Sequence, residues 1–376
     1  MFLAAGVVAV FALSIGLAAS RSSDDADDRT EAPTTTSGAA TTTDIANAEP
    51  TAGTGSSEPP ANALDQAAVT VNVSSVPEEL TYLQLIVLTT DGAASLDLST
   101  GDLVPFDAPE APSAGYERIQ PTDLGIVVFD SSNGTSRLVD WDLSTSIDLG
   151  DGGWPAHFDG ERLWFVDWGG DGRELATLDA AGARVTVWDM PEAAELIGTS
   201  EAAAYVTSHL SGSTHRVGID GTVTAAHDGI AISGGHDWIL SPTCDAQLRC
   251  GLELVDLRSG SPTRVSDLAP TTRFTAVAPA GVSRRALAVA WADAEHSLII
   301  DADNRTATSI RGGGTSTDPS ELTTDPEVRY QISSRLRRVS FTELATGIAW
   351  SIELPDIVRR VVIAPEGWTP PPPTSS

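Results

Sequence analysis

The sequence predicts an all-β domain over residues 68–368, and three observations lead to this prediction. A unit of short apolar strands and turns recurs along the whole segment. Its strands include continuous apolar runs, as at residues 85–88 and 163–166, which are typical of strands buried on both faces. After residue 19, no apolar stripe of helical period appears in the sequence. Together these observations favour a seven-bladed β-propeller, with six or eight blades as alternatives.

Each repeat comprises an apolar strand, a turn, a second strand that ends in an acidic residue, and a turn of small residues before a third strand. The pairs Asp91-Gly92 and Asn133-Gly134 are strong signals for tight hairpins between the first two strands. The acidic residues that end the second strands are Asp97, Asp142, Asp179, Asp220, Asp256, Asp301 and Glu343.

The spacing of these acidic residues sets the size of the repeat. Glu343 lies 246 residues after Asp97, so that the six intervals average 41 residues. A propeller blade of four strands takes roughly 40 to 50 residues. Each carboxylate is expected to accept local backbone N–H groups, while a following glycine takes the positive φ that a tight turn requires.

The two ends of the domain predict how the ring of blades closes. Residues 361–367 (VVIAPEG) closely match residues 275–281 (TAVAPAG), which form the strand that enters the sixth repeat. We therefore expect the C-terminal strand to enter the first blade and pair with residues 85–88. The alternative is that residues 69–73 pair with the last blade. One of the two is needed, because an open ring leaves two exposed sheet edges.

The first 20 residues predict a hydrophobic helix that serves as a signal peptide or a signal-anchor. Residues 1–19 carry no charge, and as a helix they would span roughly 28 Å, close to a bilayer core. A secretory signal begins with a basic region, which is missing here. Its absence predicts either a translation start upstream of Met1 or a short signal-anchor. The small residues Ala18, Ala19 and Ser20 suit cleavage. Both interpretations place the rest of the chain outside the cytoplasm, membrane-anchored or secreted.

Two further segments are predicted to be disordered. Residues 21–67 are rich in Ser, Thr, Pro and Asp and contain only two large apolar residues, Ile45 and Leu64, too few to offset the entropy of ordering. As a flexible linker they would span roughly 40 Å. Residues 369–376 form a Pro-rich tail.

The charge balance excludes several classes of function. The chain has 52 acidic and 22 basic residues, a net charge of −30, so neither nucleic acid nor an anionic lipid surface is an expected partner. A membrane contact is expected only through residues 1–19, if they stay uncleaved. All basic residues are Arg, which rules out a Schiff-base or phosphate-loop Lys.

The repeat pattern, read at residues 96–101, 255–260 and 341–347, resembles the extracytoplasmic WD40-like and YVTN-like β-propeller proteins of high-GC bacteria. The resemblance covers residues 68–368. The Gly-His and Trp-Asp pairs of true WD40 repeats are absent from most of the copies. What the resemblance implies is a rigid disc that presents loops to a protein or a ligand.

Two groups of residues stand out as candidate sites. Cys244 and Cys250 flank five residues between two apolar strands, and a disulfide there would stabilise the fold by about 2 kcal/mol; a reduced pair is the alternative. The second group predicts an anion or partner patch, with ion pairing to neighbouring Asp and Glu as the alternative. It comprises Arg335, Arg337, Arg338, Arg359 and Arg360.

No catalytic, cofactor-binding or metal-binding residues are predicted. The sequence lacks Gly-x-Ser-x-Gly and His-Glu-x-x-His, although a hairpin would bring His209 and His215 together. Residues 167–172 resemble a calcium loop only faintly and are better explained as a hairpin turn.

The sequence therefore favours a tethered or secreted module that binds a protein or ligand, or acts as a scaffold. One alternative is a secreted hydrolase or lyase with its site in the propeller axis. Another is the extracytoplasmic sensor domain of a signalling protein truncated at its N-terminus.

Overall fold

The computed structural model describes most of the chain from residue 68 onwards. The described residues are 68–90, 92–112, 117–169, 172–235, 237–247, 250–266, 274–277, 285–290, 296–301, 304, 306–311 and 323–372. They all belong to the compact unit Pro59–Ser376. The predicted N-terminal helix, the predicted linker and residues 373–376 of the predicted tail lie outside them. Over the described residues, no helix has the length and apolar character needed to span a bilayer.

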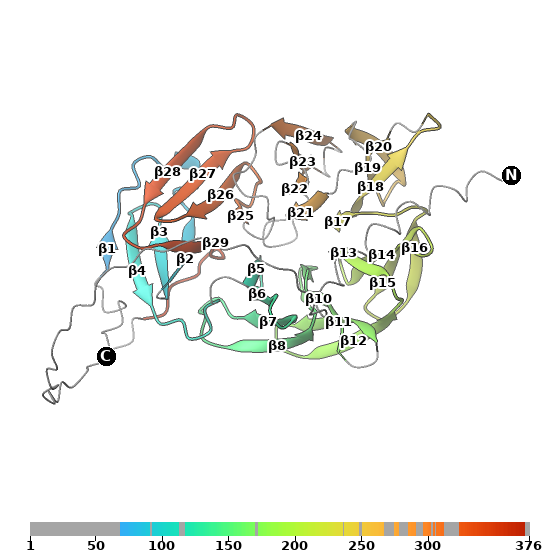
Figure 1. Cartoon of the computed structure of the whole chain (residues 1–376), viewed down its shortest axis with the longest axis horizontal. Coiled ribbons are helices and arrows are strands. Elements are labelled where there is room, and N and C mark those ends of the chain that lie inside the picture. The colour runs from blue at the N-terminus through green and yellow to red at the C-terminus, as the bar shows by residue number, and fades with distance from the viewer. Residues whose placement is uncertain are drawn as a thin grey trace, which may run out of the picture. The chain divides into compact units, whose positions relative to one another are not determined.

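The described strands of this unit form seven antiparallel sheets, six of four strands and one of five, arranged around a common centre (Figure 1). The all-β, seven-bladed prediction is thus confirmed. We call the sheets blades one to seven, in chain order of their second strands. The innermost strands of neighbouring blades lie side by side, as β9 does with β13, β13 with β17, and β25 with β29.

The blades are described from the innermost strand outwards. Blade one consists of β29 (Val358–Ile363), β2 (Gln84–Thr89), β3 (Ala93–Asp97), β4 (Asp102–Phe106) and β1 (Val69–Thr70). Blade two consists of β5 (Glu117–Thr122), β6 (Gly125–Asp130), β7 (Thr135–Val139) and β8 (Ser146–Asp151). Blade three consists of β9 (His157–Phe158), β10 (Arg162–Asp167), β11 (Arg173–Asp179) and β12 (Arg184–Met190). Blade four consists of β13 (Ala194–Ser200), β14 (Ala203–Ser208), β15 (Ser213–Gly218) and β16 (Val223–His227).

The remaining three blades repeat the same order. Blade five consists of β17 (Ser233–Gly235), β18 (Trp238–Cys244), β19 (Cys250–Asp256) and β20 (Ser261–Ser266). Blade six consists of β21 (Phe274–Val277), β22 (Arg285–Ala290), β23 (His296–Asp301) and β24 (Thr306–Arg311). Blade seven consists of β25 (Thr323–Thr324), β26 (Tyr330–Arg335), β27 (Arg338–Glu343) and β28 (Ala349–Glu353). A 3₁₀ helix, η2 (Glu78–Leu80), precedes blade one.

The C-terminal strand closes the ring by completing blade one. β29 pairs antiparallel with β2, with Leu85 opposite Ile363 and Ile86 opposite Val362. The closure predicted from residues 361–367 is confirmed. The alternative, in which residues 69–73 pair with the last blade, is wrong, because β1 pairs with β4 at the outer edge of blade one.

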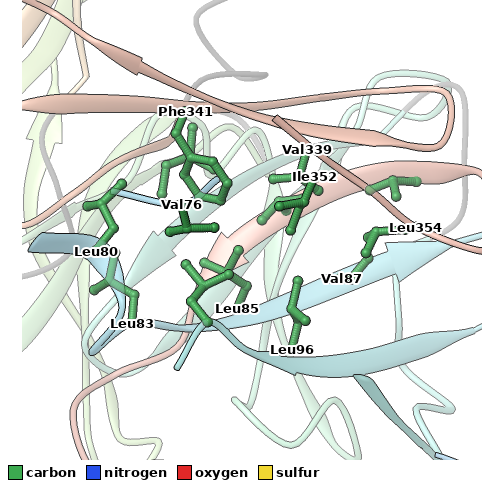
Figure 2. Packing of buried hydrophobic residues seen from close by; sticks show 14 of the residues in the cluster. Val76, Leu80, Leu83, Leu85, Val87, Leu96, Val339, Phe341, Ile352 and Leu354 are labelled. Carbon is green, nitrogen blue, oxygen red and sulfur yellow. The ribbon is translucent and has the colours of Figure 1, made fainter. Parts of the chain in front are cut away.

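The second strand of a blade is buried on both faces because neighbouring blades cover it from either side. In β2, Leu85 and Val87 pack with blade-seven residues such as Phe341, and Figure 2 shows this cluster around Val76, Leu80 and Leu83. Alternate residues of the same strand, Ile86 and Leu88, pack instead with apolar residues of blade two. A continuous apolar run in the sequence therefore reflects two separate cores that share one strand.

The second strand of a repeat is the third strand of a blade, because an innermost strand precedes it. Most of the acidic residues that end these third strands hold the turn as expected. Asp97 Oδ1 accepts the backbone N–H of Ser99 at 2.7 Å, and Asp220 Oδ1 accepts that of Thr222 at 3.0 Å. Burial raises the pKa of Asp97, but the hydrogen bonds from Ser99 outweigh it, and its pKa lies below 3.8.

Blade two is an exception. There Asp140 accepts the backbone N–H of Ser144 at 2.7 Å, whereas Asp142 accepts the indole N–H of Trp368 at 3.0 Å. The prediction that Asp142 holds this turn is wrong, because the carboxylate two residues earlier reaches the turn. Asp142 instead fixes the segment that follows the closing strand.

The innermost strands approach one another so closely that side chains are excluded at one point. A Cβ atom at Gly198 in β13 would overlap the carbonyl oxygen of Gly234 in β17 and lie 2.9 Å from its Cα. Both obstructing atoms belong to the backbone, so no rotamer change relieves the overlap. Glycine at position 198 is therefore needed for blades four and five to pack.

We predict that Gly198→Ala lowers the free energy of unfolding by about 2 kcal/mol or more, because the blade contact must open to admit a methyl group. Gly172→Ala is the matched control, since no heavy atom lies within 4 Å of its Cβ position. Urea denaturation of both variants measures the difference. Equal midpoints for the two variants would contradict this packing.

Candidate functional site

One face of the propeller is formed by the hairpins between the second and third strands of the blades. Hairpins of this face bond to the chain where it passes from one blade to the next. The backbone N–H of Trp168 donates to Asp151 O at 2.7 Å, that of His209 to Ala193 O at 3.1 Å, and that of Val358 to Leu336 O at 2.6 Å. These contacts place hairpins and connections on one side, which we call the hairpin face.

Large apolar side chains are exposed at the hairpin tips of three blades. Trp168 in blade three is 54% exposed, Leu210 in blade four 75%, and Leu336 in blade seven 68%. Ile357, in the connection from blade seven to blade one, is 44% exposed. Exposed apolar residues that recur on one face indicate an interaction site more strongly than isolated ones do.

The arginines singled out in the sequence lie at the blade-seven end of this face. Arg335, Arg337 and Arg338 are exposed on the β26–β27 hairpin, and Arg359 and Arg360 are half-buried on β29. Two backbone bonds bring the two groups together, from Leu354 N–H to Arg337 O at 2.7 Å and from Val358 N–H to Leu336 O. We call Arg335, Leu336, Arg337, Arg338, Ile357 and Arg359 the arginine surface.

The ion pairs of the described residues do not include four arginines of this region. Within the described structure, no ion pair involves Arg335, Arg337, Arg338 or Arg359, although Glu353 lies opposite Arg338 in the strand register. Arg360 makes an interaction of its own, so it is left out of the surface. Ion pairing with neighbouring acids, the alternative explanation of the cluster, is therefore not what these four side chains do in the described structure.

Leu336 occupies a backbone conformation that glycine usually takes. Its φ is +55°, in the left-handed region, at the first position of a two-residue turn between Arg335 and Arg338. Bulky residues are rarely found there, and the conformation costs about 1 kcal/mol. Leu143 and Val328 have similar positive φ values but are buried, whereas the Leu336 side chain is exposed to solvent.

The blade-three tip is built around Trp168 and two arginines. The guanidinium of Arg173 lies 5.2 Å from the centre of the Trp168 ring, a cation–π contact. Asp167 accepts the backbone N–H of Gly169 at 2.8 Å and forms an ion pair with Arg184. Residues 170 and 171 lie outside the described residues. The carboxylate of Asp167 thus stabilises the hairpin through these two contacts.

The two cysteines lie at matching positions of the two strands of the blade-five hairpin. Cys244 and Cys250 are direct partners in the register of β18 and β19, and Cys244 is disulfide-bonded. Residues 248 and 249 lie outside the described structure. The pairing ties the ends of a loop on the hairpin face.

The described histidines of blade four each have a separate partner. His209 Nε2 lies 3.2 Å from Glu195 Oε2, His215 Nε2 lies 3.0 Å from Ser213 Oγ, and His227 Nε2 lies 3.2 Å from Ser241 Oγ. The hairpin therefore does not join His209 to His215. His236 lies outside the described residues. Within them, no group of three or more His, Cys, Asp or Glu residues is placed to hold a metal ion.

His157, at the start of the innermost strand of blade three, is a half-buried side chain with a strongly lowered pKa. Burial disfavours its charged form and lowers its pKa from 6.5 to about 4. Its Nε2 atom is buried and finds no hydrogen-bond partner within the described structure. The ring is therefore neutral at physiological pH.

Sequence reasoning found the arginine cluster but missed the apolar tips and His157. The segment Arg335-Leu336-Arg337-Arg338 contained the signal for Leu336, since a large apolar residue stands between charges inside a tight turn. Nothing in the sequence distinguishes His157 from the other histidines, because its burial depends on residues distant in the chain.

Comparison with known proteins gives only distant similarities. No family model matches the chain, and no curated protein matches it. Among solved structures, TolB from Acinetobacter baumannii is 11% identical, with 75% of this chain and 82% of that chain covered and a TM-score of 0.41. AztD from Citrobacter koseri is 12% identical, covering 76% and 99%, with a TM-score of 0.43. An oligogalacturonate lyase from Vibrio parahaemolyticus is 11% identical, covering 81% and 99%, with a TM-score of 0.46.

Similarity at this distance carries no argument about activity or partners. The propeller architecture implied by the resemblance to WD40-like and YVTN-like proteins is present in the seven sheets. The bacterial group and the extracytoplasmic setting stay predictions.

We predict that the protein, isolated with its thiols blocked, takes up no alkylating label before reduction and two labels after it, one for each cysteine. Reduction lowers the free energy of unfolding by about 2 kcal/mol, because the short loop is released. Mass spectrometry and urea denaturation measure the two effects. The double variant Cys244→Ser/Cys250→Ser should be insensitive to reductant. Labelling of the unreduced protein would refute the bond.

We predict that His157 makes the fold less stable as the pH falls from about 6.5 to about 4. The unfolded chain binds the proton at its ordinary pKa, whereas the folded protein does so only near 4, so protonation favours unfolding. The full difference amounts to about 3 kcal/mol at most. Carboxylates with a lowered pKa, such as Asp97, also reduce the stability as the pH approaches 4, but they are the same in the wild type and in a His157 variant, so the difference between the two proteins reports His157.

Urea denaturation of the wild type and His157→Gln across this pH range measures the effect. The variant should lose less stability between pH 6.5 and 4 than the wild type. The control is His215→Gln on blade four, where the Nε2 atom has a hydrogen-bond partner in Ser213; this variant should follow the wild type. Parallel curves for all three proteins would show that His157 is not desolvated.

Proposed function

We propose that this chain is an extracytoplasmic β-propeller, secreted or tethered through residues 1–20, that acts as a binding module and contacts a protein partner through its hairpin face. The observation that carries the proposal is the exposure of Trp168, Leu210 and Leu336 at equivalent hairpin tips. The uncharged first 19 residues and the paired cysteines support a location outside the cytoplasm.

The chemistry of the hairpin face suits a protein better than a small molecule. Aromatic residues, other large apolar residues and arginine are the types that contribute most to protein interfaces. Here they stand at the ends of hairpins, from which they reach a broad surface. A small ligand is instead enclosed by convergent groups in a concave site.

The hydrolase or lyase alternative and the sensor alternative rest on the sequence alone. The first requires acids or histidines that gather at one mouth of the axis. His157 has a lowered pKa on the innermost strand of blade three, whereas the carboxylates with a lowered pKa, such as Asp97 and Asp220, are held by hydrogen bonds within turns. The binding module is therefore the function we favour.

Site-specific photo-crosslinking in the cells that produce the protein tests this proposal. A photoreactive amino acid at Leu210 or Leu336 should give a discrete crosslinked protein band. The matched controls are Tyr82 and Ile348, which are similarly exposed but lie at the opposite ends of the strands, before β2 and between β27 and β28. Crosslinks only from the control positions, or from none, would refute the hairpin face as the interface.

A further inference from the structure

We propose that the arginine surface binds an acidic protein segment that carries an apolar side chain among its carboxylates. This inference rests on the proposed function and goes beyond it by assigning the chemistry of the partner. It is carried by two independent observations on the same few residues, the positive charge without ion pairs and the strained, exposed leucine.

The first observation concerns charge. Arg335, Arg337, Arg338 and Arg359 form no ion pair with the described residues, in a chain whose net charge is −30. A guanidinium matches a carboxylate in shape and binds it through two parallel hydrogen bonds. The surface therefore offers sites for several carboxylates in a row, spread over one hairpin and the adjoining strand.

Two acidic residues that the structure describes lie beside this surface in the chain or in the strand register. Glu353 lies opposite Arg338 in the register of β27 and β28, and Asp356 precedes Ile357. Neither forms an ion pair with the arginines within the described structure.

The second observation concerns Leu336. Its side chain is 68% exposed at a φ of +55°, and the bonds from Val358 and Leu354 hold the turn against the neighbouring connection. The backbone of the turn is thus fixed before any partner arrives, which lowers the entropic cost of binding. Ile357 lies in the same connection and adds a second apolar contact.

These features favour a protein segment over other anionic ligands. A flat anionic membrane would bring many lipid charges close to a chain that is strongly negative overall, and the repulsion would outweigh a local contact. Inorganic phosphate or sulfate would use the arginines but leave Leu336 without a role. An acidic segment with an apolar residue would pair with the arginines and would also cover the exposed side chain of Leu336.

Fluorescence anisotropy with the full-length protein tests the inference. The probe is a short labelled peptide of Asp and Glu residues around one central Phe. We expect saturable binding that weakens strongly between about 0.05 and 0.3 M salt, because charge drives the encounter. A peptide with Lys in place of the acids should not bind, and one with Ala in place of Phe should bind about tenfold more weakly.

Leu336→Gly is the most informative variant. Glycine suits the positive φ, so the free energy of unfolding should stay the same or rise. The affinity for the Phe-containing peptide should nevertheless fall about tenfold. Leu210→Gly, at the equivalent tip of blade four, is the matched control and should bind the peptide as the wild type does. Unchanged binding by Leu336→Gly would overturn the role of the leucine.

Arg335→Gln/Arg337→Gln should lose the salt-dependent part of peptide binding, whereas Arg216→Gln on blade four should not. If inorganic phosphate displaces the labelled peptide as effectively as unlabelled peptide does, the surface is a simple anion site and the proposal is overturned. Tighter binding to phosphatidylglycerol vesicles than to the peptide would overturn it in favour of a membrane.

The failure of this inference is distinguishable from that of the proposed function. If the photoreactive group at Leu336 captures a protein while no acidic peptide binds, the hairpin face is an interface but the partner chemistry is wrong. If no hairpin-face position is crosslinked, the proposed function itself fails.

Discussion

The pairing of β29 with β2 is the interaction on which the rest of the structure depends. It joins the last strand of the domain to the first blade and removes the two open edges that a linear array of sheets would leave. It also fixes both neighbours of β2. Because Leu85 and Ile86 point to opposite faces, one strand helps to build the core with blade seven and the core with blade two. Without β29, both cores would lose one wall.

Closure also determines which parts of the molecule are free to vary. The sheets are held by backbone ladders and by apolar contacts between blades, and the innermost strands meet so closely that Gly198 admits no side chain. The hairpins and the connections between blades lie outside these constraints. Residues there can be selected for contact with other molecules, which is why loops carried by rigid scaffolds so often hold function. The exposed tips at Leu210 and Leu336 belong to this unconstrained part.

The sequence was sufficient to predict the fold because the fold is repetitive. A strand buried on both faces must be apolar at every position, and a tight turn needs an acid and small residues, so each blade repeats the same local pattern. The closure was predictable for a related reason, since residues 361–367 resemble the entering strand of another blade. The blade-two turn was misassigned because Asp140 and Asp142 both fit the pattern, and only the structure shows that Asp140 reaches Ser144.

The candidate site was predictable only in part, for a physical reason. Its charges are clustered in the sequence, so Arg335, Arg337 and Arg338 were visible without a structure. The exposure of Leu336 depends on its place in a turn, and the burial of His157 depends on elements that are distant in sequence. Periodicity reports how strands pack, but it carries no information about what the tips of hairpins contact.

The arginine surface combines features that are each unfavourable for the isolated protein. Like charges gather on one hairpin, a leucine faces water, and its backbone adopts a left-handed conformation that costs about 1 kcal/mol. Glycine at position 336 would relieve the backbone and remove the apolar exposure. The described core would keep its packing, since Leu336 belongs to none of the buried clusters. A surface that lowers stability in this way is understandable if the same residues gain free energy elsewhere. Binding to a segment that supplies both carboxylates and an apolar side chain would offset this cost, because it neutralises the arginines and covers the leucine at once.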